Sequence, residues 1–181
     1  MAFRKKITIL YIVYFKRFTG SIGKMGLLSG KKGLIMGVAN ERSIAWGIAK
    51  ACSSQGAKLA FTYQGDALKK RIIPLAESVG SNLTFQCDVA DQDAVKETFA
   101  KIKDELNDID FLVHAIGFSD KNELRGRYID TSKKNFLTTM DISVYSFTAV
   151  AQEAEKIMPQ GGSILTLTYY GSEKVLPHYN V

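Results

Sequence analysis

Residues 37–47 place two glycines and a serine hydroxyl directly after a short apolar run, residues 33–36. Gly37 lets the chain turn sharply, because glycine tolerates a positive φ. Ser43 offers a hydroxyl and a backbone amide at the start of a helix, where anionic phosphates bind. Gly47 is expected to let that helix pack closely on the strand. This chemistry predicts phosphate binding, but the spacing is not Gly-x-Gly-x-x-Gly, so an ordinary structural turn remains an alternative for this segment alone.

A second apolar run ends at Gln64, where a dinucleotide-binding fold presents a side chain to the adenosine ribose. Gln64 can hydrogen-bond neutral ribose hydroxyls, and residues 61–64 contain no Asp, Glu or Arg. The cations Lys69, Lys70 and Arg71 lie a helical turn further on. The sequence therefore favours NADH over NADPH, because no cation adjoins Gln64 to bind a 2′-phosphate.

Three further segments, residues 87–89, 114–118 and 168–170, each follow an apolar run. Each segment taken alone is also consistent with the ordinary end of a strand leading into a loop. Ligands of open α/β sheets bind at the carboxyl ends of the strands, so the joint occurrence of these segments predicts a dinucleotide site. His114 ends a buried run and is interpreted as a core histidine rather than an acid or base.

Apolar runs alternate with longer amphipathic segments from Lys32 onward, which is typical of βαβ units on a parallel sheet. We expect strands at residues 33–36, 58–62, 83–86, 111–114 and 163–168. We expect helices at residues 43–55, 66–78, 91–106 and 132–158, the last one broken or bent near residues 141–143. The right-handed crossover rule favours the order 3-2-1-4-5 along the sheet, that of a Rossmann-type doubly wound α/β fold.

Asp91 and Ser132 are expected to cap the last two of these helices. Apolar residues follow each cap at helical spacing and are expected to face the core. They are Val95, Phe99 and Ile102 in the first helix and Phe136, Met140 and Val144 in the second.

The formal charge of +6 arises entirely from residues 1–24, which hold six basic and no acidic side chains. The rest of the chain is neutral, which argues against binding of duplex nucleic acid. The apolar run at residues 7–15 is far shorter than the about 20 residues that span a bilayer. We expect residues 1–24 to lie outside the fold, with a membrane-surface or targeting role as the alternative. Cys52 and Cys87 form no metal-binding motif, so we expect no disulfide, no metal and a reducing, cytoplasmic setting.

From Met25 to Val181 the chain resembles the bacterial NADH-dependent enoyl-acyl-carrier-protein reductases, a divergent branch of the short-chain dehydrogenases/reductases. The resemblance rests on residues 37–39, 43–47, 61–64, 87–89, 111–118 and 177–181. It implies hydride transfer from NADH to the β-carbon of a trans-2-enoyl thioester on acyl carrier protein, in fatty-acid elongation. It also implies a homo-oligomer, a tetramer in the family.

The resemblance also assigns roles to individual residues. NADH would be bound by Gly37, Ser43, Ile44, Gln64, Asp88, Val89 and Ile116, with Asp88 and Val89 at the adenine. Ser119 would contact the acyl substrate. Tyr179 would be the catalytic tyrosine and Tyr169 the second active-site tyrosine, provided that the intervening segment loops back.

In this family a lysine follows the catalytic tyrosine by seven residues, whereas this sequence stops two residues after Tyr179. We therefore expect residues 25–181 to be an incomplete reductase domain that lacks the family's last strands and helices and is inactive alone. His178 stands where the family has asparagine, and no role is assigned to it. Two alternatives stay open: an ordinary carbonyl-reducing short-chain dehydrogenase that uses Tyr170 and Lys174, and a non-catalytic NAD-binding remnant.

Overall fold

Six parallel strands form the central layer of the structure, a computed structural model that describes residues 7–9, 26–176 and 179–180. The strands are β1 (Ile7–Ile9), β2 (Lys32–Met36), β3 (Lys58–Tyr63), β4 (Thr84–Gln86), β5 (Phe111–His114) and β6 (Gly162–Thr166). Their order across the sheet is β1-β6-β5-β2-β3-β4. Strands β2 to β6 therefore follow the expected Rossmann order, 3-2-1-4-5 when counted along the chain.

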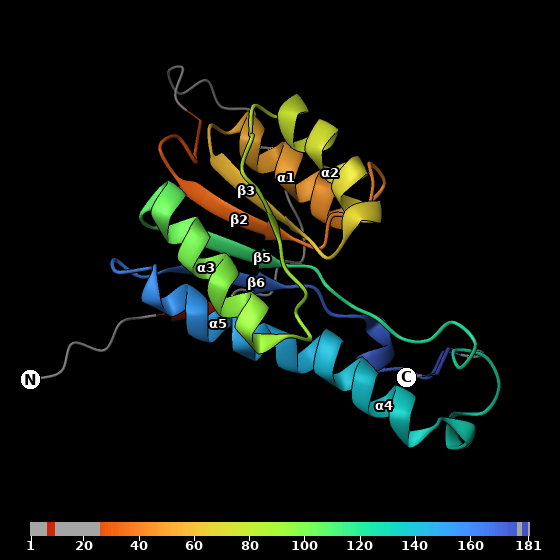
Figure 1. Ribbon diagram of the computed structural model, residues 1–181. Coiled ribbons are helices and arrows are strands. Elements are labelled where there is room, and N and C mark those ends of the chain that lie inside the picture. Colours follow the sequence, from red (N-terminus) through yellow and green to blue (C-terminus); the bar gives the residue numbers. More distant parts are fainter. Residues whose placement is uncertain (1–6, 10–25, 177–178, 181) are drawn as a thin grey trace, which may run out of the picture.

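Helices cover both faces of the sheet (Figure 1). One face carries α1 (Ile44–Ser54) and α2 (Asp66–Ser78), and the other carries α3 (Gln92–Leu106) and α5 (Ser146–Lys156). The chain reaches α5 from α4 (Lys133–Met140) through a π-helical turn, η2 (Asp141–Tyr145). Two single turns of 3-10 helix are η1 (Tyr128–Asp130) and η3 (Tyr170–Ser172). The helix expected to be broken or bent near residues 141–143 is thus interrupted there, by the π-helical turn.

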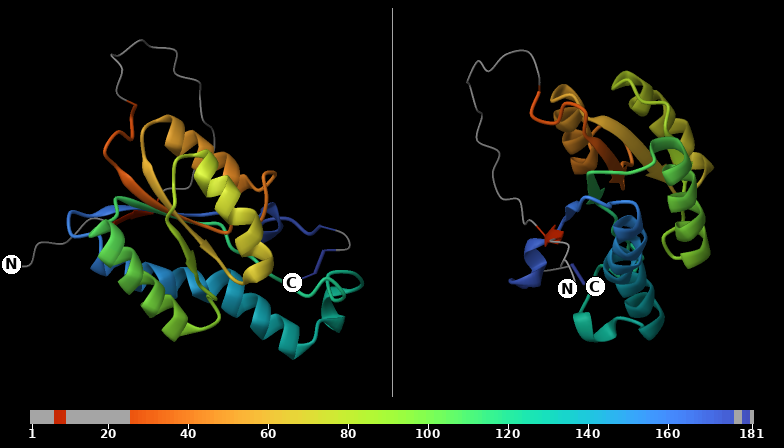
Figure 2. Two further views of the ribbon diagram at one scale, coloured as in Figure 1. Left: turned by 45° about the horizontal axis from the view of Figure 1, so that its top comes forward. Right: turned by 90° about the vertical axis from the view of Figure 1, so that its left-hand side faces the viewer.

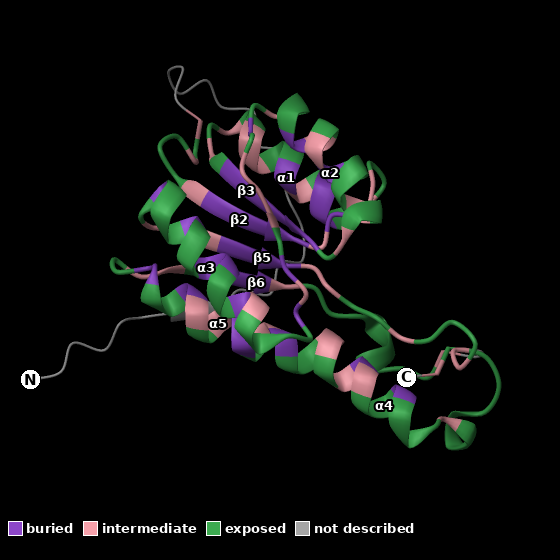
Figure 3. Ribbon diagram, in the orientation of Figure 1, coloured by how far each residue is buried: buried purple, intermediate pink, exposed green. Residues whose placement is uncertain are grey.

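Successive side chains of each strand point to opposite faces of the sheet, so a separate core forms on each side. Leu34 and Met36 of β2 pack toward α3 and α5, whereas Ile35 packs toward α1 and α2. Figure 3 shows the buried residues concentrated on the strands and on the sheet-facing sides of the helices. Burial on both faces explains why each strand is a continuous apolar run in the sequence.

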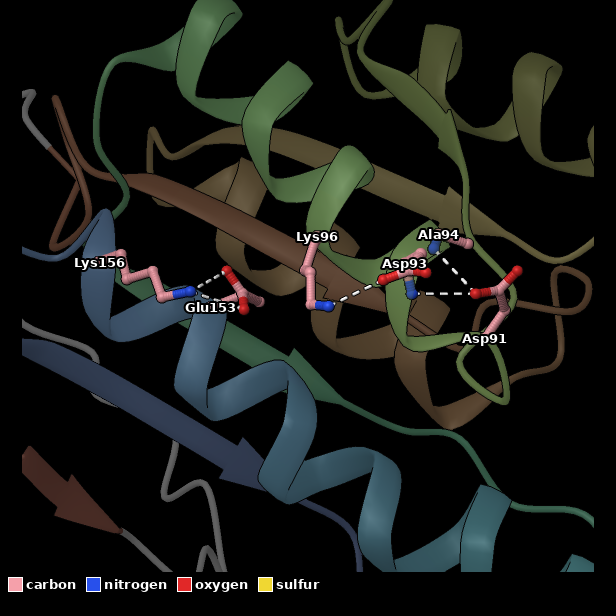
Figure 4. Close-up of polar contacts among 6 residues, drawn as sticks. All are labelled: Asp91, Asp93, Ala94, Lys96, Glu153 and Lys156. Carbon is pink, nitrogen blue, oxygen red and sulfur yellow. Dashed lines mark hydrogen bonds and ion pairs between the residues drawn. The ribbon is translucent and has the colours of Figure 1, made fainter.

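Both predicted helix caps are confirmed. The Asp91 carboxylate accepts hydrogen bonds from the backbone N–H groups of Asp93 (2.9 Å) and Ala94 (3.2 Å) at the start of α3 (Figure 4). The Ser132 hydroxyl accepts one from the backbone N–H of Asn135 (3.0 Å) at the start of α4. Each cap satisfies N–H groups that have no partner inside the helix.

Ion pairs one turn apart occur on α3 and α5, which run side by side on the sheet (Figure 2). Lys96 pairs with Asp93 at 2.8 Å on α3, and Lys156 pairs with Glu153 at 2.6 Å on α5 (Figure 4). Exposed pairs one turn apart contribute little to stability. The packing of α3 against the sheet is therefore stabilised mainly by Val95, Phe99 and Ile102, which are buried as expected.

The outward face of α4 and η2 departs from the prediction. Phe136 and Val144 were expected in the core, but 38% and 56% of their surfaces are exposed. The buried residues of α4 are instead Asn135 and Thr139. The helical spacing is therefore correct, but the apolar side does not face the sheet.

Two other expectations differ from the structure. Ile7–Ile9 pairs with Gly162–Ile164 of β6, so three residues of the segment expected outside the fold extend the sheet. The domain boundary at Met25 stays a prediction. A Cβ on Gly47 would meet no described atom within 4 Å, so the expected close packing of α1 at this glycine is wrong. Among the described residues, no helix combines the length and apolar character needed to cross a membrane.

Candidate functional site

A cavity of about 280 Å³ opens at the carboxyl ends of β2, β3, β4 and β5. The strand order reverses here, because β2 lies between β3 and β5, and such switch points bind ligands in open α/β sheets. The lining comprises residues 37–39, 62–64, 87–89 and 115–118, together with Leu68 and Ile142. The prediction that strand-end segments meet at one edge is confirmed for these four. Residues 168–170 do not line the cavity.

Gly37 directly follows β2 in a conformation that other residues rarely adopt, with φ at +91°. A Cβ at this position would lie 2.0 Å from the carbonyl oxygen of Ala115. Glycine is therefore required both for the sharp turn and for the close approach of the loop after β5. This requirement confirms the turn inferred from the sequence.

The Ser43 hydroxyl holds the loop between β2 and α1. It accepts hydrogen bonds from the backbone N–H groups of Ala39 and Asn40, both at 3.0 Å. With its lone pairs engaged, the hydroxyl can still donate its own proton to a ligand. Ile44 begins α1 and is 70% exposed. Neither Ser43 nor Ile44 lines the cavity itself; both lie beside it at the helix N-terminus.

Gln64 and Asp88 meet at the mouth of the cavity. The Gln64 amide Nε2 donates a hydrogen bond to the Asp88 carboxylate at 3.0 Å. The other Asp88 oxygen accepts one from the backbone N–H of Ala90 at 3.1 Å. Both side chains line the cavity, as does Val89, so this corner presents an amide, a carboxylate and an apolar surface. Burial raises the pKa of the neighbouring Cys87 thiol, which therefore lines the cavity as a neutral group.

The loop after β5 is held by side chains that the sequence analysis did not single out. Ile116 lines the cavity, whereas Ser119 lies outside it and accepts a hydrogen bond from the Asn135 Nδ2 at 3.1 Å. Ser143 of η2 bonds the backbone of Phe118. No motif in the sequence marks Asn135 and Ser143, which are two polar residues of the helix expected at residues 132–158.

His114 is buried and neutral, as interpreted from the sequence. The Ser146 hydroxyl donates to the Ile142 carbonyl at 2.6 Å, so it accepts from the His114 Nε2–H at 2.8 Å. The opposite ring nitrogen faces the Thr166 hydroxyl at 3.4 Å. Burial lowers the pKa of His114 from 6.5 to about 4. An imidazole with this pKa and these partners is a structural group in the core.

Tyr169 and Tyr179 come together, which the assigned roles require. Their ring centroids lie 4.9 Å apart, and their planes are inclined at 43°. The Asn180 N–H donates to the Leu124 carbonyl at 3.0 Å, which ties the segment of Tyr179 to the loop after β5. About half of the surface of each tyrosine is exposed, and neither lines the cavity.

Tyr170 and Lys174 lie on the outside of the same segment. Tyr170 begins η3, and its carbonyl accepts a hydrogen bond from the Lys174 N–H at 3.1 Å. The two residues share one irregular turn rather than an α-helix, and both side chains are exposed. Pro177, His178 and Val181 lie outside the described residues.

Comparison with known proteins identifies the family. The sequence profile described as "Enoyl-(Acyl carrier protein) reductase" matches residues 37–181. The chain belongs to the enoyl-acyl-carrier-protein reductase family. It is 62% identical to "Enoyl-[acyl-carrier-protein] reductase [NADH] 1" of Rhizobium meliloti over 156 residues. These residues make up 86% of this chain and 57% of that protein. A Rickettsia bellii protein with the corresponding name is 53% identical over 86% of this chain and 60% of its own length.

Solved structures of the family have the same fold. An Anaplasma phagocytophilum reductase in complex with NAD is 58% identical, with a TM-score of 0.83 over 88% of this chain and 62% of its own. A Bacillus cereus reductase with NADP+ and an indole naphthyridinone is 46% identical, with a TM-score of 0.84 over 86% of this chain and 62% of its own. This chain thus spans about three fifths of the length of the reductases that it matches.

Within the enoyl-reductase fold, the residues assigned from the sequence fall into three groups. Those at the strand ends line the cavity: Gly37, Gln64, Asp88, Val89 and Ile116. Ser43 and Ile44 lie at the start of α1, and Ser119, Tyr169 and Tyr179 lie beyond the cavity. The individual roles stay predictions. The described residues contain no group of three or more His, Cys, Asp or Glu placed to hold a metal ion.

Proposed function

We propose that this chain forms the dinucleotide-binding part of an NADH-dependent enoyl-acyl-carrier-protein reductase, which reduces trans-2-enoyl thioesters in fatty-acid elongation in the cytoplasm. The observation that carries the proposal is the cavity at the switch point of the sheet, built from four strand-end segments. The names of the relatives support the reaction, because they are NADH-dependent enoyl-acyl-carrier-protein reductases.

NADH fits the residues present at this site. Gly37 lets the loop after β5 approach the turn after β2, because a Cβ here would lie 2.0 Å from the Ala115 carbonyl oxygen. The Ser43 hydroxyl and the N-terminal amides of α1, beginning at Ile44, suit a pyrophosphate. The volumes of typical ligand pockets range upward from about 300 Å³. The cavity of about 280 Å³ is therefore large enough for part of a dinucleotide. When bound, NADH supplies the hydride that reduces the β-carbon of the substrate.

The adenosine end of the cofactor would lie against Gln64, Asp88 and Val89, and Ile116 would line the path toward the nicotinamide. The Asp88 carboxylate stands 3.0 Å from the Gln64 amide, so an anion already occupies the neighbourhood of the ribose. A 2′-phosphate brought here would be repelled by that carboxylate. Preference for NADH over NADPH follows.

Calorimetric titration of the chain with NADH and NADPH tests the cofactor assignment. NADH should bind more tightly. Asp88→Asn removes the charge and should narrow the difference between the two cofactors several-fold, whereas Asp104→Asn, an exposed change on α3, should leave it unaltered. Equal or tighter binding of NADPH by the unchanged chain contradicts the assignment, and the NADP+ complex of the Bacillus cereus relative makes that comparison necessary.

Tyr179 is proposed to donate a hydrogen bond and a proton toward the negative charge that develops on the thioester oxygen. Its ring rests against Tyr169 at 4.9 Å, so Tyr169 limits where the phenol can point. Ser119 is proposed to contact the acyl chain from the loop after β5. The alternative, an ordinary carbonyl reductase, would instead use Tyr170 and Lys174.

A chimaera separates these assignments, because the chain spans 57% of the Rhizobium meliloti relative and that relative can supply the remaining length. Loss of NADH absorbance with a crotonyl thioester measures turnover. Tyr179→Phe should lower the rate by about 10²–10⁴, the usual scale for a positioned proton donor. Tyr170→Phe should change it little. The reverse result would favour the carbonyl reductase, and cofactor binding with no turnover in any chimaera would favour a non-catalytic NAD-binding role.

Acyl carrier protein is the proposed carrier of the substrate, and a homo-oligomer is the proposed assembly. The outer face of α4 and η2 supports an assembly, because Leu137, Val144 and Tyr145 are 55%, 56% and 44% exposed. Exposed large apolar side chains gathered on one helical segment favour such a role.

A further inference from the structure

The helix α4 turns its polar residues inward. Its buried residues are Asn135 and Thr139, with 5% and 7% of their surfaces exposed, whereas Leu137 is 55% exposed. Burying an amide is unfavourable unless its hydrogen bonds are satisfied. The partners of Asn135 therefore reveal what this face of the helix is for.

Both ends of the Asn135 amide bond the loop after β5. The Oδ1 accepts a hydrogen bond from the backbone N–H of Asp120 at 3.0 Å, and the Nδ2 donates one to the Ser119 hydroxyl at 3.1 Å. These residues follow directly on Gly117 and Phe118, which line the cavity. One buried side chain thus fixes the outgoing end of the cavity loop.

Ser143 fixes the neighbouring residue of the same loop from η2. Its hydroxyl accepts a hydrogen bond from the Phe118 N–H at 3.0 Å and donates one to the Phe118 carbonyl at 3.1 Å. Both backbone polar groups of Phe118 are therefore satisfied by a single side chain. No described strand or helix includes residues 117–120, so these bonds take the place of a ladder of backbone hydrogen bonds.

The π-turn lets one face of the helix serve both contacts. In a regular α-helix, residues eight apart differ by about 80° around the axis, because eight residues make about 2.2 turns. A π-turn has more residues per turn, which reduces this drift and keeps Ser143 on the side of Asn135. The turn is itself anchored, since Ser146 donates to the Ile142 carbonyl at 2.6 Å and accepts from buried His114.

We propose that Asn135 and Ser143 are positioning residues, which clamp the loop Gly117–Asp120 in the shape that the cofactor cavity requires. Neither residue lines the cavity, so each acts through the loop backbone. On this view, the Ser119 hydroxyl is a structural partner of Asn135 as well as a candidate substrate contact. The consequence for cofactor affinity rests on the proposed function, whereas the clamp itself does not.

Amide hydrogen exchange, measured by NMR on the full chain without cofactor, tests the clamp directly. Ser143→Ala should speed exchange of the Phe118 amide by about tenfold or less, the scale of one net hydrogen bond, and leave the Asp120 amide unchanged. Asn135→Leu should speed exchange of the Asp120 amide and leave the Phe118 amide unchanged. Ser143→Thr and Asn135→Asp keep the acceptor oxygens and should therefore keep the Phe118 and Asp120 amides protected from exchange. Thr148→Ala, on the exposed side of α5, serves as the control. Unchanged exchange at Phe118 in Ser143→Ala overturns the clamp.

Titration with NADH, followed by its fluorescence, then tests the consequence. Both clamp-breaking variants should bind NADH about three- to tenfold more weakly, at an unfolding midpoint close to that of the Thr148→Ala control. Faster exchange with unaltered NADH affinity overturns the positioning role. If the unchanged chain binds no NADH, the proposed function fails, and the exchange measurements alone decide whether the clamp exists.

Discussion

His114 makes the stability of the chain depend on pH in a way that a single substitution can isolate. Its ring is 1% exposed, and burial lowers its pKa from 6.5 to about 4. The unfolded chain therefore binds a proton more readily than the folded chain between these two pH values. The free energy of unfolding should be independent of this group above pH 6.5 and should fall as the pH drops toward about 4.

The size of the effect follows from the shift. A difference of one pKa unit corresponds to about 1.36 kcal/mol, so protonation of His114 costs the fold about 3 kcal/mol once the pH is below both values. At about pH 5.5 the loss should be about 1.4 kcal/mol. His114→Gln removes the titration and keeps a donor near the Nε2 position that bonds Ser146.

Urea unfolding at a series of pH values measures this effect, with the fluorescence of Trp46 as the probe. Trp46 is the single tryptophan and is buried, so its emission reports on the core. Carboxylates also titrate in acid, and the difference between the unchanged chain and His114→Gln cancels their contribution. Parallel stability curves for the two proteins from pH 7 to pH 4 would refute the reasoning, because they would show that His114 protonates as easily in the folded chain as in the unfolded one.

Four further substitutions test local features of the fold and of its outer surface. Gly37→Ala should destabilise the chain by about 2 kcal/mol or more, because φ is +91° and the new Cβ would meet Ala115. Gly47→Ala should instead stabilise α1 by up to about 1 kcal/mol. Urea unfolding followed by circular dichroism compares the two variants. Asp91→Ala should cost about 1 kcal/mol through loss of the α3 cap, measured in the same way, and an unchanged midpoint would contradict the cap. Leu137→Glu should lower the sedimentation mass of any oligomer without lowering stability, and an unaltered mass would exclude this face of α4 from the assembly.

The sheet and its order could be predicted because the sequence pattern and the physics coincide there. Strands buried on both faces must be apolar throughout, and the crossover rule then leaves few possible orders. The cavity segments were predictable for the same reason, since Asp88 and Ile116 each lie two residues beyond strands whose ends share one edge. Asp91 was predictable as a cap because it directly precedes a segment with apolar residues at helical spacing.

Other features depend on partners that are distant in the sequence. The pairing of Ile7–Ile9 with β6 is a backbone contact and leaves no pattern in the side chains. Tyr169 and Tyr179 were paired only on the condition that the segment between them loops back, and their separation of 4.9 Å depends on η3 and on the Asn180 contact with Leu124. Gly47 was misjudged because a glycine in a helix has the same sequence signal whether or not anything packs against it.

The clearest failure, the burial predicted for Phe136 and Val144, shows what a hydrophobic stripe does and does not establish. A stripe at helical spacing identifies a face that avoids water, and in an isolated domain that face is taken to be the core. In α4 the inward face is occupied by the amide of Asn135, because the loop after β5 has backbone groups that need partners. The apolar residues are therefore left on the outside, where only another surface can cover them. The same segment thus bonds the cavity loop on one side through Asn135 and Ser143 and leaves its apolar side chains exposed on the other.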